Sequence, residues 1–348
     1  MPSSLTPLSL TPILGGRHHL TGTTECELDR YTKPDQHISD IPFSRTPTPS
    51  SPHGSSCKRS KCKQTNGLHL PGCSSYRYEH HLGCGSEAFV YQCGTHALKA
   101  PKILNLTLLD EKERRRAEYY NKGNREALER EKEVYKRVGR ECDGVAECVD
   151  ILDEGILLVC YKKGDLERYI TEEKEVDESI KTTWILSAIS TIHHLHHVSK
   201  VLVYDIALRN FLLTDDLLTL KMIDFGQASV FPPDTDITTA NDDGTTVQVD
   251  IFHLGCIIYS IMLWQSYHND LAHHDWVPPP IEDLPKLDGL GPWGEIIKKC
   301  WSCQYRSSKE LHDEVLALFQ PSTPNSLFAR GWMSLILDLF SRMFWSSG

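Results

Sequence analysis

The pattern of apolar and polar positions changes at about residue 76, where short strand-like runs begin. These runs lie at residues 76–82, around Val90 and Tyr91, at 95–99 and at 149–161. Cys93 and Gly94 have the composition of a tight turn between the second and third runs. The pattern therefore predicts a small antiparallel sheet.

Longer stretches with helical composition accompany these runs. Residues 110–138 are strongly charged, and Leu128, Glu131 and Tyr135 are spaced to lie near one face of a helix. Beyond residue 164 we predict helices at 180–197 and 251–263, with short strands near Val201 and at 220–223. The predicted class is α+β with two lobes. An N-terminal lobe, residues 76–161, holds the small sheet and one helix, and a larger, mostly helical C-terminal lobe spans residues 162–320.

Segments of different composition flank these lobes. Residues 1–75 are rich in Pro, Ser, Thr, Gly and His, so we predict a disordered tail. Cys57, Cys62 and Cys73 lie among basic residues there, but their spacing favours a solvated basic tail over a zinc knuckle. Residues 321–348 form a strongly apolar tail that is too short to span a membrane. Docking on the protein's own large lobe is favoured over a membrane interface or a partner.

Composition narrows the possible partners. The formal charge of -10 over 348 residues disfavours binding to nucleic acid or to an anionic membrane surface. The cysteines follow no disulfide framework, the N-terminus lacks the pattern of a signal peptide, and no apolar run is long enough for a transmembrane segment. We expect an intracellular protein, cytoplasmic or nuclear, with protein or small-molecule partners. The sequence does not indicate an oligomeric state.

Candidate phosphate-binding residues occur in the first half of the predicted sheet. Gly83 and Gly85 lie in a turn between strands, where missing side chains let backbone N–H groups approach phosphate oxygens. Lys99 follows nine residues after Val90 on the next predicted strand, so it can reach phosphates beneath the same loop. Glu131 could hold that lysine from the predicted helix, although among many glutamates only its register distinguishes it.

The most specific signal lies in the second half of the chain. Asp205 ends a short predicted strand, Asn210 follows five residues later, and Asp224-Phe225-Gly226 comes after a hairpin-sized gap. This set supplies a base and two oxygen ligands for magnesium.

With these motifs, residues 76–318 resemble the protein kinase superfamily. Asp250, which begins an apolar helical run, and Cys300-Trp301 in a later helix match structural elements of that family. The resemblance implies in-line transfer of the γ-phosphoryl group from MgATP to a protein hydroxyl, with serine or threonine favoured and tyrosine not excluded. It implies catalytic roles for Asp205, Lys99, Glu131 and Arg209, and magnesium ligation by Asn210 and Asp224. It also implies ATP-binding roles for Leu82, Gly83, Gly85, Ser86, Val90, Ala97, Lys99, Val159, Tyr161 and Leu212.

Three features depart from the family pattern. Val203 and Tyr204 replace the usual His-Arg before the catalytic aspartate, so control by phosphorylation of the activation loop is not expected. No Ala-Pro-Glu follows Gly226 before Asp250. Ala207 occupies the position where serine/threonine kinases commonly have a lysine, whereas Arg209 resembles the tyrosine-kinase version of this loop. These substitutions resemble the divergent kinase-like proteins of filamentous fungi.

Alternatives to an active protein kinase stay open. A pseudokinase scaffold would keep the fold, and perhaps the nucleotide, without phosphorylating peptides. A small-molecule kinase of the aminoglycoside or choline type would share the catalytic half, but the Asp250 helix and Cys300-Trp301 argue against it.

His193 and His197 have a spacing that zinc can use. Without a glutamate in the metalloprotease position, they are interpreted as structural.

Overall fold

The computed structural model describes residues 80–271 and 275–319 of the chain. Five antiparallel strands in the first half of this part form one sheet. In spatial order they are β1 (His80–Cys84), β2 (Ala88–Cys93), β3 (His96–Pro101), β5 (Ile156–Val159) and β4 (Cys148–Ile151). The predicted antiparallel sheet is therefore present. The turn between β2 and β3 is one residue later than predicted, because Cys93 pairs with His96 and leaves Gly94 and Thr95 as the two turn residues. Gly94 has φ +64°, which such a turn favours.

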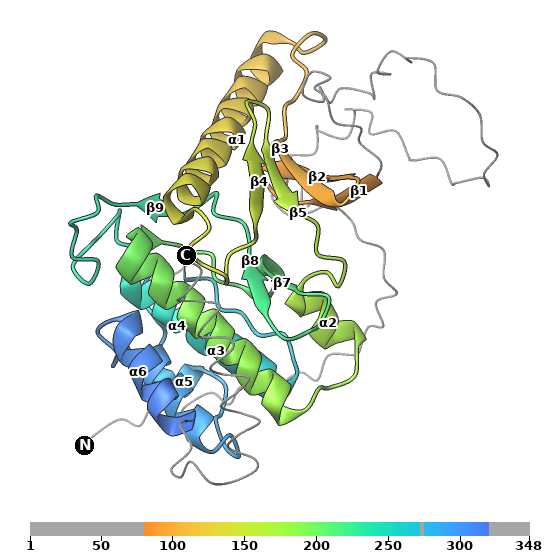
Figure 1. Cartoon of the computed structure of the whole chain (residues 1–348). Helices are drawn as coiled ribbons and strands as arrows, with labels where there is room; N and C mark the ends of the chain where they lie inside the picture. The colour runs from red at the N-terminus through yellow and green to blue at the C-terminus, as the bar shows by residue number, and fades with distance from the viewer. Residues whose placement is uncertain (1–79, 272–274, 320–348) are drawn as a thin grey trace, which may run out of the picture. The chain divides into compact units, whose positions relative to one another are not determined.

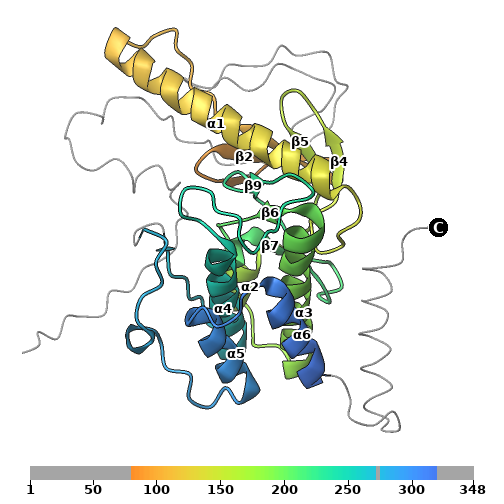
Figure 2. The ribbon, with the colours of Figure 1, turned by 90° about the vertical axis from the view of Figure 1, so that its left-hand side faces the viewer.

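One long helix, α1 (Glu111–Val138), packs against β3. It begins at a capping box in which Asp110 accepts a hydrogen bond from the N–H of Glu113, and it ends at Gly139. Figures 1 and 2 both show this helix beside the sheet. Leu128, Glu131 and Tyr135 are all buried, as the spacing predicted.

The second lobe is mostly helical. Its helices are α2 (Leu166–Glu172), α3 (Glu178–His194), α4 (Val247–Leu263), α5 (Pro292–Trp301) and α6 (Ser308–Phe319), with 3-10 turns η3 (Leu208–Asn210) and η5 (Ile281–Asp283). Helix α3 ends three residues before the predicted end and continues as a π-helical segment, η2 (Leu195–Ser199). The short strands are β6 (Val201–Leu202), β7 (Phe211–Leu213), β8 (Leu220–Met222) and β9 (Ser229–Val230), paired as β6 with β9 and β7 with β8.

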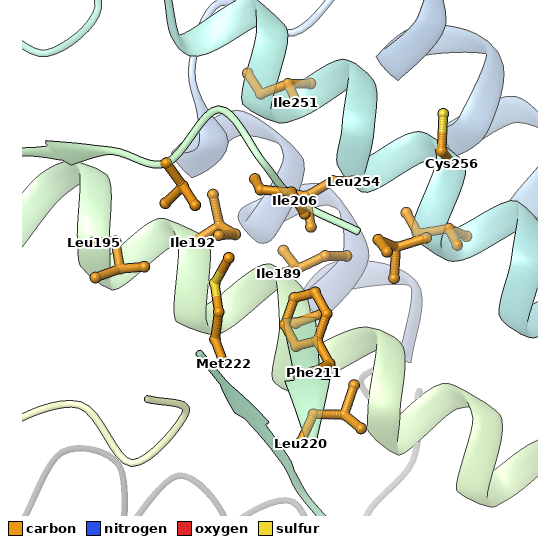
Figure 3. Packing of buried hydrophobic residues seen from close by; sticks show 14 of the residues in the cluster. Ile189, Ile192, Leu195, Ile206, Phe211, Leu220, Met222, Ile251, Leu254 and Cys256 are labelled. Atoms are coloured by element: carbon orange, nitrogen blue, oxygen red, sulfur yellow. The ribbon is translucent and has the colours of Figure 1, made fainter. Parts of the chain in front are cut away.

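The core of this lobe lies between α3 and α4 (Figure 3). Ile189 and Ile192 of α3 pack in one buried cluster with Leu254 of α4. Phe211 of the short strand β7 belongs to the same cluster. Each such side chain contributes roughly 1.5–3 kcal/mol on burial. The packing gives the loop between β6 and β7 a rigid base. No helix of the described residues is both long and apolar enough to cross a membrane. Both predicted tails lie outside the described residues.

Candidate active site

Lys99 is the centre of a charged cluster that joins the two lobes. Its Nζ atom on β3 lies 2.6 Å from Oε2 of Glu131 on α1 and 2.8 Å from Oδ1 of Asp224. The Glu131 side chain is 1% exposed and that of Lys99 13%, whereas 41% of the Asp224 side chain is exposed. One cation therefore holds a buried carboxylate and a more accessible one.

The environment sets the charge of each member of this cluster. Burial alone would lower the pKa of Lys99, but Glu131 and Asp224 outweigh it and raise that pKa. Burial raises the pKa of Glu131, and Lys99 offsets this increase only in part. Burial would also raise the pKa of Asp224, but the charge and hydrogen bond of Lys99 leave it below its ordinary value. Lys99 is thus a cation, and Asp224 an anion, across the neutral range.

Asp224 is held in an uncommon backbone conformation. Its φ is +67°, which costs an L-residue roughly 1–2 kcal/mol. The next residue, Phe225, is fully buried and packs edge-on against Tyr135 of α1, with ring centroids 5.5 Å apart. Val203 is also fully buried in the same cluster. These contacts and the Lys99 ion pair hold Asp224 in place.

Asp205 lies in the loop between β6 and η3. The Nη2 atom of Arg209 is 2.6 Å from its Oδ1. The side-chain amide of Asn210 donates to the Asp205 carbonyl oxygen at 2.9 Å and to Oδ2 at 3.0 Å. Because the amide nitrogen of Asn210 is used in these bonds, its carbonyl oxygen is the atom left to act as a ligand.

A buried carboxylate beneath this loop fixes its backbone. Asp250 of α4 accepts hydrogen bonds from the N–H groups of Val203 at 2.8 Å and Tyr204 at 2.7 Å. Its Oδ2 also lies 2.8 Å from Nε2 of His196, whose other ring nitrogen is 3.0 Å from the Ser308 hydroxyl. Sequence reasoning found Asp250 but did not separate His196 from its neighbouring histidines, because only the fold brings it to the carboxylate.

The register of the sheet decides which residues share a face with Lys99. Val90 pairs with Lys99, and Ala97 pairs with Leu158. Directly paired residues lie on the same face, and side chains alternate along a strand. Val90, Ala97 and Leu158 therefore lie on the face of Lys99, whereas Val159 lies on the opposite face. The register therefore favours Leu158 over the predicted Val159 as the residue beside Lys99, since a shift of one residue exchanges the two faces.

The other predicted adenine-site residues lie where the sheet leads into the helical lobe. The Tyr161 hydroxyl accepts a hydrogen bond from the N–H of Glu147 at 3.3 Å. Leu212 lies between Phe211 and Leu213, whose side chains enter the core of the helical lobe, so alternation directs Leu212 away from that core.

The glycine loop has room for a ligand at its backbone. A Cβ atom placed on Gly83 would meet no other atom within 4 Å, and the N–H of Gly85 donates to the Ala88 carbonyl at 3.0 Å. Ser86 is exposed in the bend, and Leu82 lies in the β1 bulge with 46% exposure. The loop could therefore approach phosphate oxygens closely.

The comparisons with known proteins agree with this geometry. The family model "Protein kinase domain" matches residues 76–287. The chain belongs to the protein kinase superfamily. The described residues form its bilobal α+β fold.

The hormonally up-regulated neu tumor-associated kinase of Mus musculus is 30% identical over 149 residues, which cover 42% of this chain and 20% of that relative, and the Homo sapiens protein matches equally well. The 3-phosphoinositide-dependent protein kinase 1 of Rattus norvegicus is 29% identical over 117 residues, which cover 29% of this chain and 20% of that relative. The chain thus spans about a fifth of the length of these relatives.

In this kinase the segment after Gly226 is tied to α1 by two arginines that sequence reasoning missed. Nε of Arg130 donates to the Gly226 carbonyl at 2.8 Å. Nη1 of Arg137 donates to the carbonyls of Phe231 at 2.8 Å and Ser199 at 3.2 Å. Tyr204, at the position of the usual arginine, is buried there. These contacts tie the backbone at Gly226 and Phe231 to α1.

The kinase's histidine cluster packs ring against ring. His193 stacks on His312 of α6 with centroids 4.6 Å apart and planes 14° apart, and it lies 4.8 Å from the His197 ring. Burial, followed by the neighbouring histidines, lowers the pKa of His193 to about 4. Within residues 80–271 and 275–319, no group of three or more His, Cys, Asp or Glu side chains is placed to hold a metal ion.

Proposed function

We propose that this chain is an active protein kinase that transfers the γ-phosphoryl group of MgATP to a protein hydroxyl. The observation that carries the proposal is the cluster in which Lys99 pairs with Glu131 of α1 and with Asp224. A chain that had lost phosphoryl transfer would have no evident need to maintain a cation shared by two carboxylates across the lobes. The fold also positions Asp205 on a loop that is bonded from below by Asp250.

Each residue has a role that follows from its position. Lys99 would bind the α- and β-phosphates, and Glu131 would fix the lysine's orientation. Asp205 would accept or orient the proton of the acceptor hydroxyl. Arg209 lies against Asp205 and would orient its carboxylate. Val90, Ala97, Leu158 and Leu212 would form the apolar walls around adenine.

The ligand chemistry also fits magnesium. Asp224 and Asn210 offer a carboxylate and an amide oxygen, and magnesium is commonly bound through one or two carboxylates while keeping waters and phosphate oxygens as further ligands. A site with so few protein ligands is compatible with the absence of a three-residue metal cluster among the described residues. Bound magnesium would offset the negative charge on the phosphates.

The acceptor is, in our proposal, a serine or threonine hydroxyl. Arg209, which is typical of the tyrosine-kinase loop, supports tyrosine as the alternative. We place the protein in the cytoplasm or nucleus. The eight cysteines that the structure describes are all free thiols, which agrees with a reducing compartment.

A pseudokinase scaffold is the second candidate, and the altered segment between Gly226 and Asp250 is the observation that favours it. A small-molecule kinase is less well supported, since the match to the protein kinase domain includes Asp250 and the rest of helix α4.

The test is phosphate transfer from labelled MgATP to mixed protein substrates, to the protein itself, and to aminoglycosides and choline. Asp205→Asn and Lys99→Met should each lower transfer by at least about 100-fold, the usual size of a lost base or phosphate contact. Asp288→Asn and Lys174→Met, at exposed positions, are the matched controls. Transfer unchanged in Asp205→Asn would contradict the assigned base. Nucleotide binding without any transfer would establish the scaffold, and transfer only to small molecules would establish the third candidate.

A further inference from the structure

The backbone of the glycine loop is anchored to the end of β3 by one lysine. The N–H of Lys102 donates to the Glu87 carbonyl at 2.8 Å, and its Nζ atom donates to the Gly85 carbonyl. The same ammonium lies 5.1 Å from the centre of the Phe89 ring. Lys102 is almost fully buried, so the loop has a defined position relative to the sheet.

The Glu87 side chain extends from this anchored loop to the opposite lobe. Its Oε1 accepts a hydrogen bond from Nε2 of Gln227 at 2.9 Å. Its Oε2 lies only 3.0 Å from the position that a Cβ atom on Gly226 would occupy, and Oδ1 of Asp224 lies 3.6 Å from that same point. Two carboxylates therefore converge beside Gly226, one from each lobe, although Glu87 and Gln227 are 140 residues apart in the sequence.

The charges of the groups that would hold the phosphates act on Glu87. Burial raises the pKa of Glu87, and the negative charge of Asp224 raises it further. Arg130 and Lys99 act in the opposite direction. The carboxylate thus interacts with both Lys99 and Asp224. Nucleotide phosphates are anions that would bind beneath this loop near Lys99, where the negative charge of the Glu87 carboxylate would oppose them.

We propose that Glu87 sets the affinity of this kinase for its nucleotide. Its carboxylate joins the glycine loop to Gln227 and lies beside Gly226 and Asp224. Binding of MgATP must displace this carboxylate. The inference rests on the proposed function because it takes ATP as the nucleotide. The hydrogen bond between Glu87 and Gln227 does not depend on that assumption.

The experiment compares four variants by calorimetric titration with MgATP. Glu87→Gln removes the charge and Glu87→Ala removes the whole contact, whereas Gln227→Ala breaks the hydrogen bond and keeps the charge. Glu133→Gln removes one negative charge from an exposed position of α1 and serves as the control. Both Glu87 variants should bind MgATP roughly three- to tenfold more tightly, the range expected for one hydrogen bond and a like-charge contact. Gln227→Ala should gain about twofold, and the control should bind as the wild type does.

Amide hydrogen exchange measures the contact without any nucleotide. In the free protein, Glu87→Ala and Gln227→Ala should increase the exchange rate at residues 83–88, because the loop loses its bond to the other lobe. Glu133→Gln should not. Unchanged exchange in both variants would show that the contact does not restrain the loop and would overturn the proposal.

The titrations separate failure of this inference from failure of the proposed function. If the wild type binds MgATP and Glu87→Gln binds it equally well, the displacement idea is wrong and the proposed function stands. Weaker binding in Glu87→Gln, seen only with magnesium, would also overturn it by identifying Glu87 as a metal ligand. If neither the wild type nor Glu87→Ala binds any adenine nucleotide, both proposals fail. Binding that appears only in Glu87→Ala would support the inference.

Discussion

Removing Lys99 should destabilise the protein much more than removing Glu131, because one cation serves two carboxylates. In Glu131→Gln, Lys99 keeps Asp224 at 2.8 Å, so no buried charge loses its partner. We expect a loss of about 1 kcal/mol in the free energy of unfolding, the size of one hydrogen bond. Lys99→Met instead leaves Glu131, which is 1% exposed, without a cation. Removing one partner of a buried ion pair costs about 3–5 kcal/mol.

This difference should depend on pH. Burial already raises the pKa of Glu131 above its unfolded value, and the loss of Lys99 raises it further. In Lys99→Met the folded state therefore binds a proton that the unfolded state releases, so its unfolding free energy falls as pH rises. The deficit of Lys99→Met relative to the wild type should shrink as pH is lowered from about 8 to about 5.

Urea unfolding followed by tryptophan fluorescence measures both effects, since Trp184 and Trp301 are buried in the helical lobe. Lys174→Met and Glu133→Gln are exposed controls that should change the unfolding free energy by less than about 0.5 kcal/mol. The reasoning is refuted if Glu131→Gln loses as much stability as Lys99→Met. A deficit of Lys99→Met that is independent of pH would show that Glu131 is not the group left unpaired.

Four further results are expected. Burial, and then the neighbouring His268, lower the pKa of His253 to about 4, so the unfolded state gains a proton first on acidification. His253 should therefore contribute roughly 3 kcal/mol to the stability lost in urea unfolding between about pH 6.5 and about pH 4, and His253→Gln should reduce the total loss by about that share. Asp250→Asn should lose about 1–3 kcal/mol of stability and most of the phosphate transfer, because a loop N–H loses its acceptor; full transfer would contradict the role given to this carboxylate. Phosphatase treatment should leave transfer unchanged, whereas Arg137→Ala should lower it; a loss on phosphatase treatment would restore phosphorylation control. Leu158→Ala should raise the KM for ATP several-fold and Val159→Ala should not; the reverse result would show that the sheet register is misassigned.

Short-range spacing in the sequence was enough to predict which residues the structure brings together at the candidate site. Asp205 and Asn210 are five residues apart in the same loop, and Asp224 follows the β7–β8 hairpin. Their relative positions therefore depend on local geometry. Lys99 lies on a strand that pairs directly with the strand after the glycine loop. The helical periodicity of α1 likewise placed Glu131 on the buried face.

The tertiary structure decided what depends on register and on contact between the lobes. Only the pairing of β3 with β5 shows that Leu158, and not Val159, shares a face with Lys99, because a shift of one residue exchanges the two faces of a strand. The partners of Glu87 and His196 lie 140 and 54 residues away in the sequence, and no local pattern marks such pairs. Arg130 and Arg137 bond to backbone carbonyls, an acceptor that every residue provides, so their partners are determined only by how the chain packs.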